Sequence, residues 1–144
     1  MPGTPETILA FDFGARRIGV AVGQQVTDSA NPLGVIRNAE KGPDWDHIQW
    51  LIREWSPARL VVGMPLHADG SASAVTKLVD SFIQDLARFG LPIDPVDERY
   101  TSVEAEQLLH SERAEGLRGR IRKEMIDSTA ALLIAERWLK KADR

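Results

Sequence analysis

Residues 8–13 form an apolar run, Ile-Leu-Ala-Phe-Asp-Phe, that only Asp12 interrupts. A strand that is apolar on both faces must be covered on both sides, so this run predicts a central strand of a doubly covered sheet. The apolar residues 18–22 follow after a short turn at 14–17 and predict a second strand, paired with the first as a hairpin. The chain therefore needs packing layers on both sides of its sheet.

The remaining apolar patterns predict an ordered series of strands and helices. A third strand is expected within residues 28–37, a fourth at 59–64 and a fifth at 92–98, with a charged mobile loop at 111–122. Helices are expected at 45–55, at 71–89, from 101 onward and at 125–141. The second of these helices should turn six residues inward: Val75, Leu78, Val79, Phe82, Ile83 and Leu86. Three strands followed by alternating strands and helices indicate one mixed α/β domain over 1–144.

Composition limits the kinds of site and location that we expect. The 144 residues include no cysteine, which excludes disulfides and thiolate zinc sites, and the net charge of −3 excludes a global basic field for nucleic acid. The first residues do not resemble a signal peptide, and no apolar run approaches the roughly 20 residues that span a membrane. We expect a cytoplasmic protein with no membrane partner.

Asp12 and Asp127 are carboxylates in unusual places. Asp12 lies inside the apolar strand, where a lone buried carboxylate is costly unless it is paired, hydrogen-bonded or bound to metal. Asp127 shares its helical face with Ala130, Ala131 and Ile134, so it should point toward the sheet. The structural alternatives are a turn-capping Asp12 and an Asp127 favoured by the helix dipole.

A third acidic position ends the fifth predicted strand, where α/β sheets commonly place ligand-binding residues. Asp97 and Glu98 are neighbours there, and successive strand residues point to opposite faces, so only one of them can face a common site. The pattern alone does not choose between them. A solvated strand end paired with Arg99 is the structural alternative.

Oxygen ligands of this kind select hard cations such as Mg²⁺ or Mn²⁺. Two such ions, about 4 Å apart, can clamp the attacking and leaving oxygens of a phosphodiester. The motifs that carry these carboxylates contain no His or Lys to neutralise them. The carboxylates should therefore repel one another when no metal is bound.

Four motifs, in this order, resemble the YqgF family, also called RuvX. They are ILAFDFGARRIGVA at 8–21, VVGMP at 61–65 with Asp69-Gly70, DERYTS at 97–102, and DSTAA at 127–131. Each motif alone is weakly specific, whereas four at these spacings are specific and cover essentially the full length.

The resemblance implies an RNase H-like fold, a five-stranded mixed sheet with three antiparallel strands, flanked by helices. It implies Asp12, Glu98 and Asp127 as catalytic residues and metal ligands for two Mg²⁺ or Mn²⁺ ions. The family is described as a nuclease for the precursor of 16S ribosomal RNA, which implies 5′-end maturation of that RNA and the ribosome or its assembly factors as partners. RuvC-type resolvases, which the family resembles, carry a second acidic residue three positions after the helix Asp, where this chain has Ala130.

Basic residues near the predicted site are candidates for binding the phosphate backbone. Five basic residues against one acid lie between 113 and 123, and two more follow Asp12 in the first turn. The predicted nucleic-acid-binding residues are Arg16, Arg17, Arg118, Arg120, Arg122 and Lys123. Their alternative is an ordinary solvated surface.

Three other functions remain to be weighed. A Holliday junction resolvase would use the same chemistry on DNA and would need a two-fold dimer, and the sequence leaves monomer and homodimer open. A non-catalytic RNA-binding assembly factor would keep the fold without cleavage. A sugar-kinase or actin-like ATPase has a similar first motif but binds nucleotide between two domains, and 144 residues suit only one.

Overall fold

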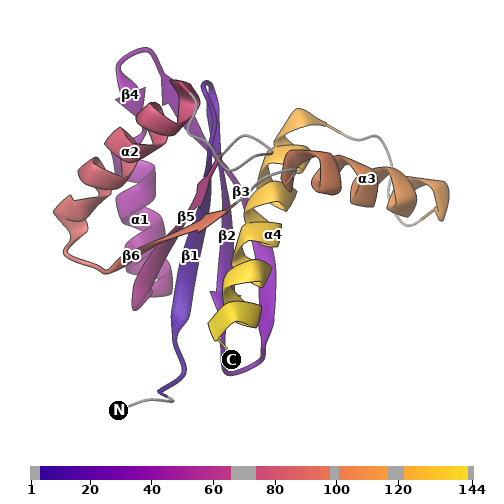
Figure 1. Cartoon of the computed structure of the whole chain (residues 1–144), viewed down its shortest axis with the longest axis horizontal. Coiled ribbons are helices and arrows are strands. Elements are labelled where there is room, and N and C mark those ends of the chain that lie inside the picture. Colours follow the sequence, from indigo (N-terminus) through magenta and orange to yellow (C-terminus); the bar gives the residue numbers. More distant parts are fainter. Residues whose placement is uncertain (1–3, 66–73, 98–100, 117–121, 143–144) are drawn as a thin grey trace.

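The computed structural model describes residues 4–65, 74–97, 101–116 and 122–142. Within these residues the chain forms one six-stranded sheet of order β4-β3-β2-β1-β5-β6 (Figure 1). The strands are β1 (Thr7–Phe13), β2 (Arg17–Gln24), β3 (Ser29–Ala39), β4 (Gly42–Pro43), β5 (Arg59–Met64) and β6 (Ile93–Asp97). β1, β2, β3 and β4 pair with one another in antiparallel fashion, whereas β5 runs parallel to β1 and β6 parallel to β5. The predicted mixed α/β fold and the position of β1 inside the sheet are confirmed.

The prediction of five strands was wrong by one short strand. The additional strand, β4, pairs Pro43 with Asn38 and Gly42 with Ala39 at the edge of the sheet. Two residues are too few to produce an alternating pattern, and Gly42, at φ 112°, has a backbone conformation that favours glycine. β3 also runs past its predicted end at Arg37 to Ala39, which is what makes this hairpin possible.

The helices occupy the predicted places with altered ends. α1 (Trp45–Trp55) begins after Asp44, whose side chain accepts a hydrogen bond from the His47 amide, and it ends at Ser56 in a left-handed conformation. α2 (Ala74–Leu86) continues into the 3₁₀ turn η1 (Ala87–Phe89), and Gly90 at φ 71° follows it. The other two helices are α3 (Thr101–Ala114) and α4 (Lys123–Ala142).

Two predictions about the helices were wrong. Residues 111–114, expected in a loop, are the last turn of α3, which stands away from the sheet in Figure 1 and so has no apolar pattern there. Val75 and Leu78, expected to face inward, are 46% and 55% exposed. Of the six predicted residues, Val79, Phe82 and Leu86 are buried, and Ile83 is half-buried against the core.

The sheet has a hydrophobic core on each face. α1 and α2 cover one face, and α4 lies across the other (Figure 1). In β1, Leu9 and Phe11 belong to the core under α1 and α2, whereas Ile8 and Ala10 belong to the core under α4. This alternation decides which face each side chain of β1 occupies.

Candidate active site

Asp12 lies on the face of β1 that α4 covers. It follows Ile8 and Ala10 at alternate positions, and both of these residues pack in the core beneath α4. Asp12 is half-buried near the end of the strand, so its carboxylate is both ordered by the sheet and accessible to solvent. The sequence expectation that this carboxylate interrupts a buried strand is confirmed.

Asp127 lies near the start of α4, on the helical face that meets the sheet. The residues that share this face, Ala130, Ala131 and Ile134, are buried. The Asp127 side chain itself keeps 30% of its surface exposed. The prediction that Asp127 points toward the sheet is therefore confirmed, and Ala130 fills the position where RuvC-type resolvases have a second acid.

Gly19 of β2 lies next to both Asp12 and Asp127. It is the cross-strand partner of Asp12 in the β1–β2 pair. A Cβ atom added to Gly19 would lie 2.0 Å from the backbone oxygen of Asp127 and 3.2 Å from the amide nitrogen of Ser128, so α4 rests directly on the backbone of β2 here. Only glycine permits this approach, and it is what gathers Asp12 and Asp127 at one end of the sheet.

Arg17 is an immediate partner of the acidic site. Its Nε donates a hydrogen bond to Asp127 Oδ2 at 2.9 Å, and the two side chains are 29% and 30% exposed. The hydrogen bond to Asp127 raises the pKa of Arg17 against the lowering effect of burial, and the charges of Asp127 and Glu124 raise it further. The acidic motifs contain no His or Lys, as the sequence analysis noted, but Arg17 pairs with Asp127 and reduces the repulsion that was expected without metal.

Asn38 was missed by the sequence analysis and fixes the turn that follows Asp12. Its Nδ2 donates to the Gly14 carbonyl at 2.7 Å, and its backbone N–H donates to the Arg16 carbonyl at 2.9 Å. A Cβ on Gly14 would lie 2.5 Å from the Arg17 carbonyl, so the turn is tightly packed as well. An asparagine near a strand end carries no sequence signal of such a role.

The third predicted carboxylate, Glu98, lies outside the described residues, as do Arg118 and Arg120. The described part of the chain contains no group of three His, Asp or Glu side chains that could hold a metal. Asp97 lies within the described residues and is exposed. Asp94 contacts Trp138 of α4 and Val96 packs against the core under α4, so these two residues face α4, and Asp97 alternates with them along β6. Its side chain thus belongs to the sheet face away from Asp12.

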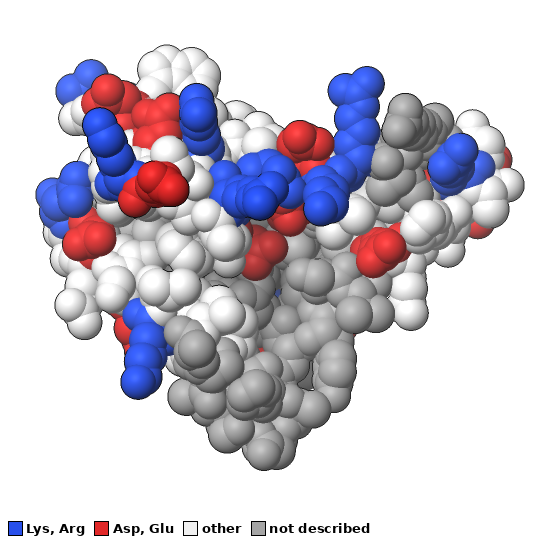
Figure 2. Space-filling model, turned by 90° about the horizontal axis from the view of Figure 1, so that it is seen from above, with Lys and Arg blue, Asp and Glu red and all other residues white. Residues whose placement is uncertain are grey.

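The remaining predicted basic residues are at the surface. Arg122 and Lys123 are exposed at the start of α4, and Arg16 is exposed in the β1–β2 turn. Seen from above, Lys and Arg side chains form an interrupted band on this end of the molecule, with acidic side chains between them (Figure 2). Among the described helices, none combines the length and hydropathy needed to cross a membrane.

Glu104, in the first turn of α3, makes contacts that are structural. It accepts a hydrogen bond from Arg137 Nη2 at 2.7 Å, and Arg137 Nη1 donates to the Asp97 carbonyl at 2.9 Å. This arginine therefore ties together α3, α4 and the end of β6.

Comparison with solved structures places the fold among junction resolvases. The chain is similar to Thermus thermophilus RuvC in complex with a Holliday junction substrate, with a TM-score of 0.57 and 12% identity over 96% of both chains. It is also similar to the yeast mitochondrial Holliday junction resolvase Ydc2, with a TM-score of 0.58 and 14% identity, covering 94% of this chain and 78% of that one. At these identities the likeness concerns the fold, which is RNase H-like.

Comparison of sequences gives much higher similarity. The chain is 46% identical over 140 residues to a protein of Nitrosococcus oceani and 47% identical over 134 residues to one of Burkholderia lata, both named "Putative pre-16S rRNA nuclease". The matches cover 96% and 92% of this chain and 89% and 88% of those proteins. The family RuvX, described as Holliday junction resolvase, matches residues 6–141. This protein therefore belongs to the RuvX family.

Proposed function

We propose that this protein is a divalent-metal-dependent endonuclease that acts on precursor ribosomal RNA. The observation that carries the proposal is the close approach at Gly19, which is the cross-strand partner of Asp12 and contacts the backbone of Asp127, so that two acidic residues far apart in sequence lie at one end of the sheet. Half-exposed carboxylates gathered in this way suit the metal-assisted hydrolysis of phosphodiester bonds.

The side chains fit a hard divalent cation. Asp12 and Asp127 offer only carboxylate oxygens, which Mg²⁺ and Mn²⁺ prefer. We propose Glu98 as the third ligand, since Asp97 lies on the opposite face of β6 and the family resemblance favours its neighbour. When bound, two such ions would supply Lewis-acid activation of water and stabilisation of the departing oxygen.

The protein's own side chains have separable roles in this proposal. Asp12 and Asp127 hold the cations at the end of β1, and the direct contact of α4 with Gly19 keeps both carboxylates in place. Arg17 neutralises Asp127 in the absence of metal. With a cation held by Asp127, the Arg17 guanidinium would be available to contact a substrate phosphate.

Precursor 16S ribosomal RNA is the proposed substrate because the relatives at 46–47% identity carry that name. We place the reaction at the 5′ end of this RNA, with the ribosome or its assembly factors as partners, and hence in the cytoplasm. Holliday junctions are the second candidate, favoured by the fold of the resolvases at 12–14% identity.

Cleavage assays with both substrates test the proposal. A precursor 16S RNA fragment and a four-way DNA junction are incubated with Mn²⁺ or with EDTA, using wild type, Asp12→Asn and Asp80→Asn. Asp80 is exposed on α2, so Asp80→Asn is a matched change of the same charge away from the site.

Metal-dependent cleavage by wild type and Asp80→Asn, but not by Asp12→Asn, supports the proposal, and the preferred substrate decides between RNA and junction. Equal cleavage by all three proteins contradicts the assignment of the site. If none cleaves while RNA still binds, the chain is a non-catalytic RNA-binding factor.

A further inference from the structure

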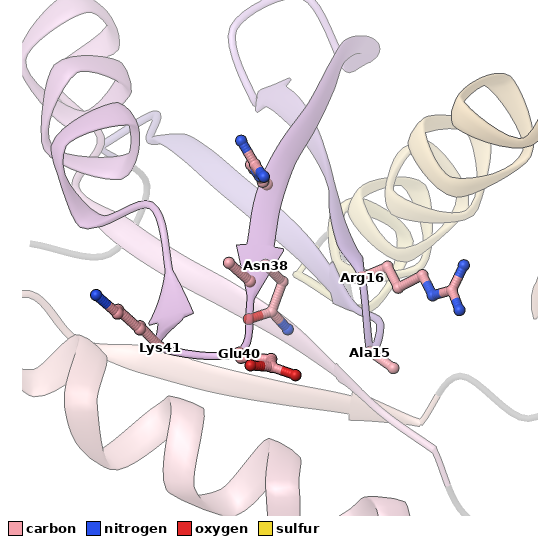
Figure 3. Close-up of a pocket in the computed structure, with 7 residues that line it drawn as sticks. Ala15, Arg16, Asn38, Glu40 and Lys41 are labelled. Carbon is pink, nitrogen blue, oxygen red and sulfur yellow. The ribbon is translucent and has the colours of Figure 1, made fainter.

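A groove of about 750 Å³ lies beside the turn that follows Asp12, between the β1–β2 turn and the β3–β4 hairpin. The turn contributes Ala15 and Arg16, and the hairpin contributes Arg37, Asn38, Glu40 and Lys41 (Figure 3). The nuclease proposal makes no use of Arg37 or Lys41.

The groove carries a positive charge in a chain whose net charge is −3. Three of its lining residues are basic and one, Glu40, is acidic. Arg16, Arg37 and Lys41 are exposed, and no ion pair involves them in the part of the chain that the structure describes. Other arginines of that part do form ion pairs with carboxylates: Arg17, Arg59 and Arg137. Among the described residues, these basic groups therefore have no carboxylate partner that would give them a structural role.

The arrangement of these charges fits an extended polyanion. Figure 3 shows Arg16 and Lys41 pointing in opposite directions, with Asn38 and Glu40 between them. Charges spread in this way do not converge on one small anion. They match a chain of phosphates, each of which needs only an exposed cation nearby.

The groove is also rigidly connected to the acidic site. Asn38 binds the carbonyls of both Gly14 and Arg16, and the Arg37 carbonyl accepts from the Asp44 amide at 2.9 Å, which closes the hairpin. Arg37 is the cross-strand partner of Arg17, which in turn holds Asp127. A strand lying in the groove would thus be held at a fixed distance from Asp12 and Asp127.

We infer that this groove binds the phosphodiester backbone of the nucleic acid strand on the β3–β4 side of the acidic site. The inference rests on the proposed nuclease function and adds a binding surface outside the basic segment at 113–123. The substrate then lies across the site, held by α4 on one side and by the β3–β4 hairpin on the other.

Binding measured without metal tests the inference independently of cleavage. Fluorescence anisotropy with a labelled precursor 16S RNA fragment in EDTA gives the dissociation constant as a function of salt for wild type and for the double variant Arg37→Gln/Lys41→Gln. The matched control is Lys140→Gln/Lys141→Gln, an equal charge change in the last turn of α4, at the opposite end of the molecule (Figure 1).

The groove variant should bind on the order of tenfold more weakly at about 100 mM salt, with a log–log salt slope reduced by about 1.4 to 1.8, since each phosphate contact contributes about 0.7 to 0.9. The control should bind as wild type does. Glu40→Gln should have the opposite effect and lower the dissociation constant, because it removes the one negative charge of the groove.

Two results would overturn the inference, and they are distinguishable. If wild type binds RNA and the groove variant matches the control in affinity and slope, the groove is not part of the interface and the nuclease proposal survives. If wild type itself binds neither the RNA nor a four-way DNA junction without metal, the groove does not hold the backbone and the inference fails, while cleavage in Mn²⁺ still decides the nuclease proposal. Melting temperatures of the variants within error of wild type exclude misfolding as the cause.

Discussion

The two faces of the sheet are built from side chains of very different size. Toward α1 and α2, β2 presents Ile18, Val20 and Val22; toward α4 it presents small residues at the alternate positions. The small residues are Gly19, Ala21 and Gly23. β1 shows the contrast in part, with Leu9 and Phe11 on one face and Ile8, Ala10 and Asp12 on the other.

This contrast separates stability from function. Large buried side chains each contribute roughly 1.5–3 kcal/mol by leaving water, so the α1/α2 face holds the fold together. The side chains of β2 on the α4 face are smaller, and this allows the helix backbone to contact the strand backbone at Gly19. Substitutions on the two faces should therefore fail in different ways.

The largest effect should come from Asp12→Asn on the α4 face. Loss of this carboxylate should reduce metal-dependent cleavage by on the order of a thousandfold, equivalent to about 4 kcal/mol in the barrier. The melting temperature in EDTA should be unchanged or higher, because a charge near Asp127 is removed while the shape is kept. A large fall in melting temperature would instead make Asp12 a structural residue.

Phe11→Ala, one position away on the opposite face of β1, should instead reduce stability strongly. Phe11 is fully buried and packs edge-on against Phe82, with ring centroids 5.9 Å apart. Its truncation should lower the free energy of unfolding by about 3–5 kcal/mol in urea denaturation. Val26→Ala, at a side chain that is 77% exposed, is the control and should change it by less than about 0.5 kcal/mol. Similar losses from both would mean that β1 is not the core strand.

Gly19→Ala and Gly23→Ala compare two glycines of β2 under the same helix. At Gly19 the added methyl meets the Asp127 backbone at 2.0 Å, so α4 must move, at a cost of about 3 kcal/mol and with loss of cleavage. At Gly23 it meets the flexible end of Ile8 at 3.0 Å, and the cost should stay below about 1.5 kcal/mol. Thermal denaturation and cleavage of both variants test this, and equal effects would contradict the close approach at Gly19.

Arg17→Gln should have the smallest effect on stability, below about 1 kcal/mol, because the pair with Asp127 is partly solvated. The pKa of Arg17 is raised in the folded state, so the pair's contribution is complete below the ordinary arginine pKa and is lost only as pH rises through the raised value. The difference in unfolding free energy between variant and wild type should accordingly be flat from about pH 6 to 9. A slope in that range would reveal a second titrating partner.

The convergence of Asp12 and Asp127 could be predicted from periodicity alone. A repeat of two in the first strand and of 3.6 in the last helix assigns each carboxylate to the face that meets the other element. The contact of Arg17 with Asp127 could not be predicted in this way, since the residues are 110 positions apart and an arginine in a turn is usually solvated. The same holds for Asn38, whose partner Gly14 is 24 positions away.

The errors in the predicted fold share a physical cause. β4 is too short for a pattern, the end of α3 has no buried face, and Leu78 belongs to an apolar stripe wider than the surface that covers it. In each case the pattern in the sequence reports burial, and burial depends on what packs against the element. Patterns therefore predicted the central strands and α4 well and the edges of the molecule poorly.

The docking of α4 against β1 and β2 also has a consequence for biosynthesis. Chains emerge from the ribosome amino terminus first, so Asp12 and Arg17 are made early, whereas Asp127 arrives within the carboxy-terminal helix. One face of the sheet stays uncovered until that helix has been translated. A nascent chain without α4 therefore has neither a paired Asp127 nor an assembled acidic centre, and any cleavage activity begins only after α4 has been synthesised.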